Sequence, residues 1–81
     1  MRKKVTVKYY AVLRQQSGIT NETIETSART VSDLYIEVSK RYSFQLPQRS
    51  MKVAVNDNFA PWDYEMQDCD LVVFIPPVAG G

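Results

Sequence analysis

The sequence contains no histidine and only one cysteine, Cys69, among its 81 residues. A disulfide needs a second cysteine, and both acid-base catalysis by histidine and the usual zinc ligand sets need histidine or several cysteines. One free thiol is typical of a protein from a reducing compartment, so a cytoplasmic location is expected. No glycine-rich phosphate-binding motif is present, and the chain itself is expected to hold no cofactor and no metal.

An excess of charge of one sign is also absent. Ten basic and nine acidic side chains leave a net charge of +1. This balance gives no electrostatic surface for nucleic acid or for an anionic membrane, so neither is expected as a partner. The basic run 2–4 is interpreted as a solvated strand end, because polar residues interrupt the apolar stretch that a signal peptide needs. The length predicts a single domain, 1–81, with a modest core.

Apolar residues recur with the spacing of β-strands in several segments. Alternation predicts strands at 5–10 and 51–55, and a polar stretch rich in threonine predicts an edge strand at 21–27. A turn that uses Gly18 is expected between the first two strands. The continuous apolar run 71–75 predicts a strand covered on both faces, at the centre of a sheet.

One segment has the pattern of an amphipathic helix. Thr30 and Asp33 form a capping box at its start, where the threonine hydroxyl accepts a hydrogen bond from the Asp33 amide. The apolar side chains that follow are spaced to form one stripe facing a sheet. They are Val31, Leu34, Tyr35, Val38 and Tyr42. Core packing, rather than a cofactor wall, is the interpretation of this stripe.

The segment 56–58 consists of Asn-Asp-Asn, which tolerates left-handed backbone and predicts a hairpin into 59–62, a short or edge strand because of Pro61. Two strands, a helix and further strands, with the last strand central, match an α+β domain of the β-grasp type. Other α+β arrangements fit these periodicities equally well.

The chain resembles the MoaD-type sulfur carriers, the small subunits of molybdopterin synthase, in four segments that occur in the same order. These segments are YYAVLRQQSG, VAVN, DLVVF and the ending FIPPVAGG. The resemblance implies a single-domain, ubiquitin-like β-grasp fold, with a mixed sheet of four to five strands and one main helix packed on one face. It also implies that the carboxylate of Gly81 is adenylated, converted to a thiocarboxylate and used as the sulfur donor to cyclic pyranopterin monophosphate in molybdenum cofactor biosynthesis.

The resemblance further implies three partners: a zinc-containing adenylating enzyme of the E1-like type that uses ATP, a persulfide sulfur donor, and the large synthase subunit in a heterotetramer. The chain is expected to be inactive alone and to act as the sulfur-donating subunit of that complex. A carrier for thiamine synthesis or tRNA thiolation, a ubiquitin-like protein modifier and a plain interaction module remain alternatives.

The chemistry explains the tail. Glycine lacks the Cβ that blocks a narrow channel, so Gly80 and Gly81 are expected to enter partner sites. The prolines at 76 and 77 remove backbone donors, and a flexible tail is expected over 76–81. Residues 78–81 then span at most about 13 to 14 Å.

Four residues are candidates for docking. Tyr10 is expected on the sheet face that no helix covers, and Phe59 is expected to be exposed because it follows the polar hairpin tip. Ile75 stands at the root of the tail, where core packing remains an alternative. Exposed apolar groups that cluster usually mark a partner surface. The resemblance implies that Tyr10, Phe59 and Ile75 match apolar partner contacts of the carriers and that Arg14 matches an arginine near the same interface. Cys69 stands where these carriers commonly have a turn glycine, and it is interpreted as structural rather than as a nucleophile.

Overall fold

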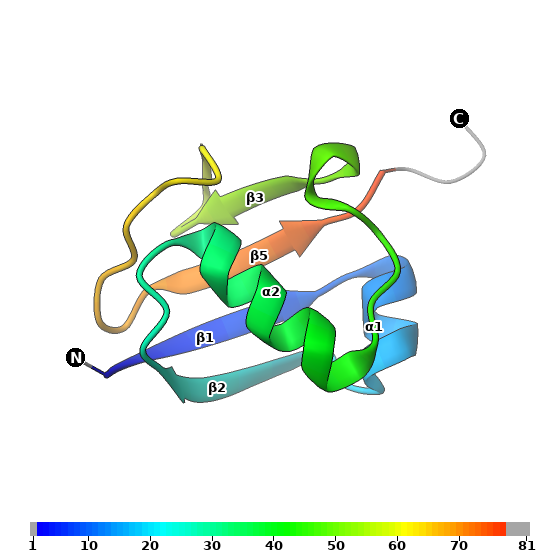
Figure 1. The fold of residues 1–81 in the computed structure, drawn as a ribbon, viewed down its shortest axis with the longest axis horizontal. Helices are drawn as coiled ribbons and strands as arrows, with labels where there is room; N and C mark the ends of the chain where they lie inside the picture. The colour runs from blue at the N-terminus through cyan, green and yellow to red at the C-terminus, as the bar shows by residue number, and fades with distance from the viewer. Residues whose placement is uncertain (1, 78–81) are drawn as a thin grey trace.

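The computed structural model describes residues 2–77, which form one five-stranded mixed sheet with a long helix across one face and a short helix at one end (Figure 1). The strand order is β2-β1-β5-β3-β4. The strands are β1 (Lys3–Tyr9), β2 (Asn21–Thr26), β3 (Lys52–Val55), β4 (Asn58–Ala60) and β5 (Leu71–Ile75). The helices are α1 (Ala11–Ser17) and α2 (Val31–Tyr42), with a short 3₁₀ turn, η1, at Gln48–Ser50.

The first and last strands are parallel neighbours, and every other pair in the sheet is antiparallel. β5 lies between β1 and β3, so both of its edges are paired, and Val72 and Phe74 are fully buried beneath α2. This confirms the prediction of a central last strand and the α+β fold of the β-grasp type. The predicted cover on both faces is wrong: α2 covers one face, whereas Leu71 and Ile75 on the opposite face are only half-buried.

Helix α2 begins and packs as its sequence predicts. The Thr30 hydroxyl accepts a hydrogen bond from the Asp33 amide at 3.1 Å, although the Asp33 carboxylate makes no return bond to Thr30. The four leading residues of the apolar stripe are buried, and Tyr42 at its end is half-buried. The stripe therefore belongs to the core, as predicted.

Helix α1 corrects the prediction that the chain simply turns between the first two strands. The Gly18 amide donates to the Arg14 carbonyl at 2.9 Å, and Gly18 ends the helix with a φ of 79°. Leu13 is fully buried and anchors the helix to the core. A helix of two turns is too short to show the helical repeat of apolar residues in its sequence. The features of the sequence that indicate this helix are the apolar Leu13 and the glycine that ends it.

No helix in residues 2–77 has the length and apolarity needed to cross a membrane.

The connection between β3 and β4 is the predicted hairpin. Asn56 and Asp57 have φ angles of 52° and 73°, and Val55 pairs with Asn58, so the loop has two residues. Left-handed backbone at both loop positions matches the twist of the flanking strands. The short edge strand β4 that follows ends at Ala60, just before Pro61.

Cys69 occupies a left-handed position, with a φ of 71°, in the turn before β5. Its amide donates to the Lys4 carbonyl at 2.7 Å, which ties this turn to β1. Glycine adopts such a φ without strain, which agrees with the turn glycine that the resemblance implies at this position. The Cys69 side chain is exposed, so its structural role is confined to its backbone.

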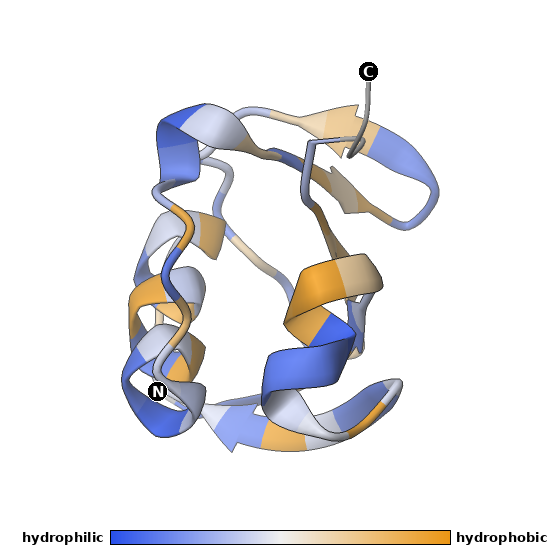
Figure 2. Ribbon diagram, turned by 90° about the vertical axis from the view of Figure 1, so that its right-hand side faces the viewer, coloured by the Kyte–Doolittle hydropathy of each residue, from blue (hydrophilic) through white to orange (hydrophobic). Residues whose placement is uncertain are grey.

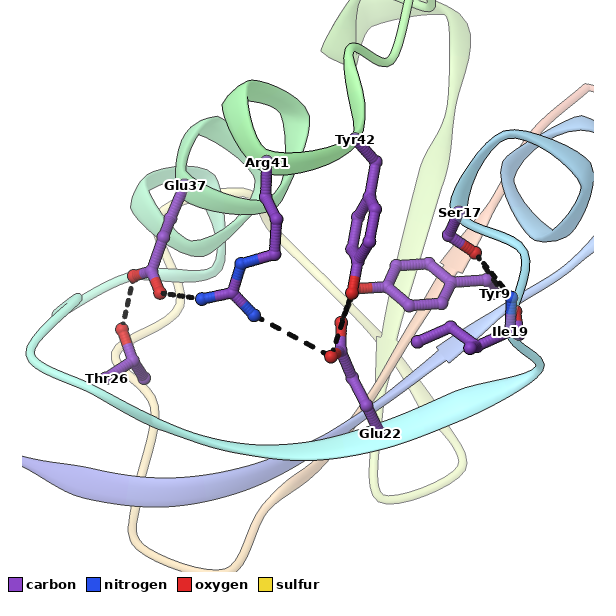
Figure 3. A network of polar contacts seen from close by, with 8 residues as sticks. All are labelled: Tyr9, Ser17, Ile19, Glu22, Thr26, Glu37, Arg41 and Tyr42. Carbon is purple, nitrogen blue, oxygen red and sulfur yellow. Dashed lines mark hydrogen bonds and ion pairs between the residues drawn. The ribbon is translucent and has the colours of Figure 1, made fainter.

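A polar network joins α2 to the sheet edge (Figure 3). The Glu22 carboxylate of β2 accepts hydrogen bonds from the phenol of Tyr9 at 2.6 Å and from that of Tyr42 at 2.8 Å. Arg41 lies between Glu22 and Glu37, at 3.7 and 3.9 Å from them. Burial, and then the bond to Glu22, raise the pKa of the Tyr9 phenol far above its ordinary value. The neutral phenol is therefore part of the folded state.

Stability is expected to fall at alkaline pH. In the unfolded chain Tyr9 ionises near pH 10, whereas in the folded protein its raised pKa keeps it protonated. Its contribution is complete below pH 10 and is lost as the pH rises, at about 1 kcal/mol between pH 10 and 11. Urea unfolding at several pH values measures this slope. Tyr9→Phe, which has no proton to lose, should show a smaller slope, and an unfolding free energy unchanged from pH 9 to 11 contradicts the expectation.

Candidate functional site

The candidate site lies on the sheet face opposite α2, next to the point where the chain leaves β5. Val73, Ala54 and Phe59 lie side by side across three strands because Val73 pairs with Ala54 and Ala54 with Phe59. Ile75 lies one pleat further along β5, and Tyr10 follows the last residue of β1 at the same level. We call these five residues the apolar patch.

The apolar patch is open to solvent at its rim and covered at its centre. Phe59 is 73% exposed and Tyr10 is 46% exposed, as predicted, while Val73 and Ala54 are buried between them. All five side chains, with Asp57 of the hairpin loop, line one shallow hollow of about 270 Å³. A cluster of large apolar side chains that a sheet exposes to solvent is the type of surface that a partner protein covers.

Two further hollows flank the root of the tail. One, of about 530 Å³, lies against α1, and the other, of about 340 Å³, lies against η1. Ile75, Pro76 and Pro77 line both of them, and Ile75 also lines the hollow of the apolar patch. Figure 2 views this end of the molecule, with α1 turned toward the viewer and its first turn coloured as hydrophobic. The half-buried Ile75 thus connects the apolar patch to the chain exit.

The backbone at the chain exit explains why the sheet ends there. β5 makes its last pairing at Ile75 with Lys52, and the two prolines that follow carry no amide hydrogen. Gly80 and Gly81, the predicted reactive end, lie outside the described residues. The structure therefore fixes the place from which the last four residues start.

Arg14 is not brought into the apolar patch. It lies on α1 with an exposed side chain and lines none of the three hollows, although its neighbour Gln15 lines the one beside α1. Sequence reasoning missed Val73 and Ala54, which are the floor of the apolar patch. Strand geometry could have found them, since side chains alternate between the two faces and every second residue of β3 and β5 faces away from α2.

Among residues 2–77 no three side chains of the types that bind metals come together. The Cys69 thiol donates to the Asp68 carboxylate at 3.5 Å, and this bond raises the pKa of the thiol above its ordinary value. A raised pKa lowers the fraction of reactive thiolate. The features that the described residues bring together are thus a docking surface and a chain exit.

Known proteins share this arrangement. The family model described as the ThiS family matches residues 7–81. The putative molybdopterin converting factor subunit 1 of Pyrococcus furiosus is 35% identical, with a TM-score of 0.77 over 94% of this chain and 99% of that one. A chain of the Amycolatopsis orientalis BexX/CysO complex is 27% identical, with a TM-score of 0.70 over 95% of this chain and 99% of that one.

The small archaeal modifier protein 1 of Methanosarcina acetivorans has the same fold, with a TM-score of 0.80 and 20% identity over 100% of this chain and 99% of that one. A molybdopterin converting factor subunit and a small archaeal modifier protein thus share the fold of this chain. The family match over most of the length and the identity to a molybdopterin converting factor subunit agree with each other. This chain belongs to the ThiS/MoaD family of ubiquitin-like β-grasp proteins.

Proposed function

We propose that this chain is the small, sulfur-carrying subunit of a molybdopterin synthase. The observation that carries the proposal is the 35% identity, over nearly the whole chain, to the putative molybdopterin converting factor subunit 1 of Pyrococcus furiosus. The ending FIPPVAGG supports it, because the sequence supplies a thin tail after two prolines. The cytoplasm, where the thiol Cys69 stays reduced, is the proposed location.

The proposed chemistry takes place at the carboxylate of Gly81. A free carboxylate is a poor electrophile, so an adenylating enzyme of the E1-like type first joins it to AMP from ATP, with loss of pyrophosphate. The outer sulfur of a persulfide donor then attacks the acyl adenylate and expels AMP, which gives an acyl disulfide. A second thiol cleaves the S–S bond of this acyl disulfide, so the thiocarboxylate is released and the two thiol sulfurs are left as a disulfide. Within the synthase, the thiocarboxylate delivers its sulfur to cyclic pyranopterin monophosphate held by the large subunit. Zinc and ATP belong to the adenylating partner in this scheme.

The described residues support two parts of this role. The apolar patch offers a docking surface beside the chain exit, so a partner that covers it also receives the tail. The tail then reaches at most about 13 to 14 Å beyond Pro77, which is enough to enter a recessed site. The chain contributes position and a reactive end, and each partner contributes the catalytic groups.

Complementation tests the proposed pathway. The wild-type chain should restore molybdopterin synthesis in a strain that lacks its own synthase small subunit but retains the other components. Failure to restore synthesis, with the chain expressed and folded and with the large subunit of the same organism supplied, contradicts the proposed pathway. A second fate of the acyl adenylate, transfer to a lysine amine, gives covalent adducts of higher mass on denaturing blots, and such adducts identify a protein modifier instead.

Phe59→Ala is expected to weaken binding to the large synthase subunit by tenfold or more. The Phe59 side chain is mostly exposed in the free chain, so its burial in a complex stabilises association, and truncation of a central aromatic anchor costs about 2 kcal/mol or more. Because little core contact is lost, the melting temperature of the free chain should be nearly unchanged. Titration calorimetry on the isolated subunits measures the affinity.

The matched control is Ile36→Ala. Ile36 is also a large exposed apolar residue, at 46%, but it lies on α2, away from the apolar patch. Its truncation should leave the affinity unchanged. If wild type and Phe59→Ala bind with equal affinity, Phe59 is not an anchor of the interface. If the melting temperature of the free Phe59→Ala chain falls by many degrees, Phe59 belongs to the core.

A further inference from the structure

Two lysines stand at opposite corners of the apolar patch. Lys8 pairs with Val73 on β1, and Lys52 pairs with Ile75 on β3, so strand alternation places both on the face away from α2. They are two strands and one pleat apart, which corresponds to roughly 12 Å between their Cα atoms. The chain exit lies beside the second of them, because Lys52 also lines the hollow of Pro76 and Pro77.

The charge of these lysines is not balanced within the described residues. The ion pairs of residues 2–77 join Arg2 to Glu25 and Arg41 to Glu22 and Glu37, and none involves Lys8 or Lys52. Arg49, beside Lys52 in the same hollow, adds a third cation without an ion pair. The acidic side chain that lines the hollow of the apolar patch is Asp57. The surface around the chain exit is therefore positive although the whole chain is nearly neutral.

This distribution of charge constrains the partner. A protein that covers the apolar patch removes water from Lys8 and Lys52, and a cation that loses water without gaining an opposite charge destabilises the complex. Carboxylates at matching positions offset this cost and also accelerate the encounter by long-range attraction.

We propose, on the basis of the proposed function, that the adenylating partner carries an apolar surface flanked by two carboxylates that meet Lys8 and Lys52. The tail enters the partner beside the carboxylate that pairs with Lys52. The two charge contacts fix the orientation of the carrier on the apolar patch, and the orientation aims the chain exit at the adenylation site.

Charge reversal tests this inference against a control on the other side of the molecule. Lys8→Glu and Lys52→Glu each change the net charge by the same amount as Lys40→Glu, whose side chain is exposed on α2. Association with the adenylating enzyme of the same organism is measured by stopped flow at low and at high salt. At low salt we expect association of the first two variants to be about tenfold slower than that of the wild type, and at high salt, where charges are screened, within about twofold of it.

Lys40→Glu should associate within about twofold of the wild type at both salt concentrations. Association of the Lys8 and Lys52 variants as fast as Lys40→Glu overturns the inference. A dimer of the free chain that Phe59→Asp dissociates also overturns it, because a second copy then covers the apolar patch. Sulfur loading of the wild-type chain is measured alongside by intact mass. If the chain gains sulfur but the charge reversals leave the association rate unchanged, only this inference is contradicted. If the chain gains no sulfur, the proposed function is contradicted as well.

Discussion

Deletion of Gly81 is expected to abolish sulfur loading and molybdopterin synthesis while leaving the fold intact. The reactive carboxylate of the proposed scheme belongs to this residue, and a shorter tail places the new carboxylate about 3.5 Å short of its position in the partner site. A displacement of this size is large compared with the tolerance of a reacting group. The core, by contrast, is complete at Phe74, and β5 ends at Ile75. Complementation and intact mass measure the loss, and a thermal melt confirms the fold.

Gly81→Ala distinguishes a requirement for tail length from a requirement for a narrow tail, because this variant keeps the length and the terminal carboxylate and adds one methyl group. Loading that survives in Gly81→Ala but not in the deletion assigns the requirement to length. Loss of sulfur loading in both variants means that the narrow passage of the partner site also requires glycine at position 81. A truncated chain that still restores molybdopterin synthesis in a carrier-deficient strain contradicts the proposed mechanism.

Leu34→Ala is expected to lower the free energy of unfolding by about 2 to 5 kcal/mol, because it empties a fully packed site. Leu34 lies on the buried face of α2 with none of its surface exposed. A domain of this size has a small net stability, so a loss near the upper end of this range leaves the chain largely unfolded at ambient temperature. Urea unfolding followed by circular dichroism measures the change.

The control for Leu34→Ala is again Ile36→Ala, two residues along the same helix and on its exposed face. Both substitutions improve helix propensity by similar small amounts, so the difference between them isolates core packing. A loss below about 0.5 kcal/mol for Leu34→Ala means that α2 does not pack on the sheet as described.

The strands, the main helix and the hairpin could be predicted from the sequence because each has a strong local signal. The apolar run 71–75 has no polar position, which is typical of a strand at the centre of a sheet, although α2 covers only one of its faces. The two left-handed positions, Asn56 and Asp57, are of residue types that adopt such backbone readily. The parallel pairing of β1 with β5 joins residues more than 60 positions apart, and no local pattern reports it.

The exposed aromatic residues of the candidate site could be predicted from the sequence, but the residues that surround them in neighbouring strands could not. Tyr10 was assigned from strand alternation and Phe59 from its place after the hairpin tip, and both are exposed beside the same hollow. The lysines at its corners were not singled out, because their positions depend on which residues of three strands lie opposite one another. Arg14 shows the converse: the resemblance implied a position near the same interface, and α1, a helix too short to predict, leaves it exposed and outside the lining of the hollow of the apolar patch. Its place near the interface stays a prediction.

The intact mass of the chain tests directly whether Gly81 carries a thiocarboxylate. The chain is purified under non-reducing conditions from its native host or produced with its adenylating enzyme, ATP and a persulfide donor. The replacement of one carboxylate oxygen by sulfur adds about 16 Da, the difference between the two atomic masses, and fragmentation should place it on Gly81, since adenylation activates the terminal carboxyl group. Oxidation of Met or Cys69 adds nearly the same mass. Alkylation distinguishes the two, because it adds an alkyl group to the thiocarboxylate sulfur, which fragmentation then places on Gly81. An unmodified Gly81 in the complete reaction, with the same chain able to bind its partners, contradicts the proposed role as a sulfur carrier.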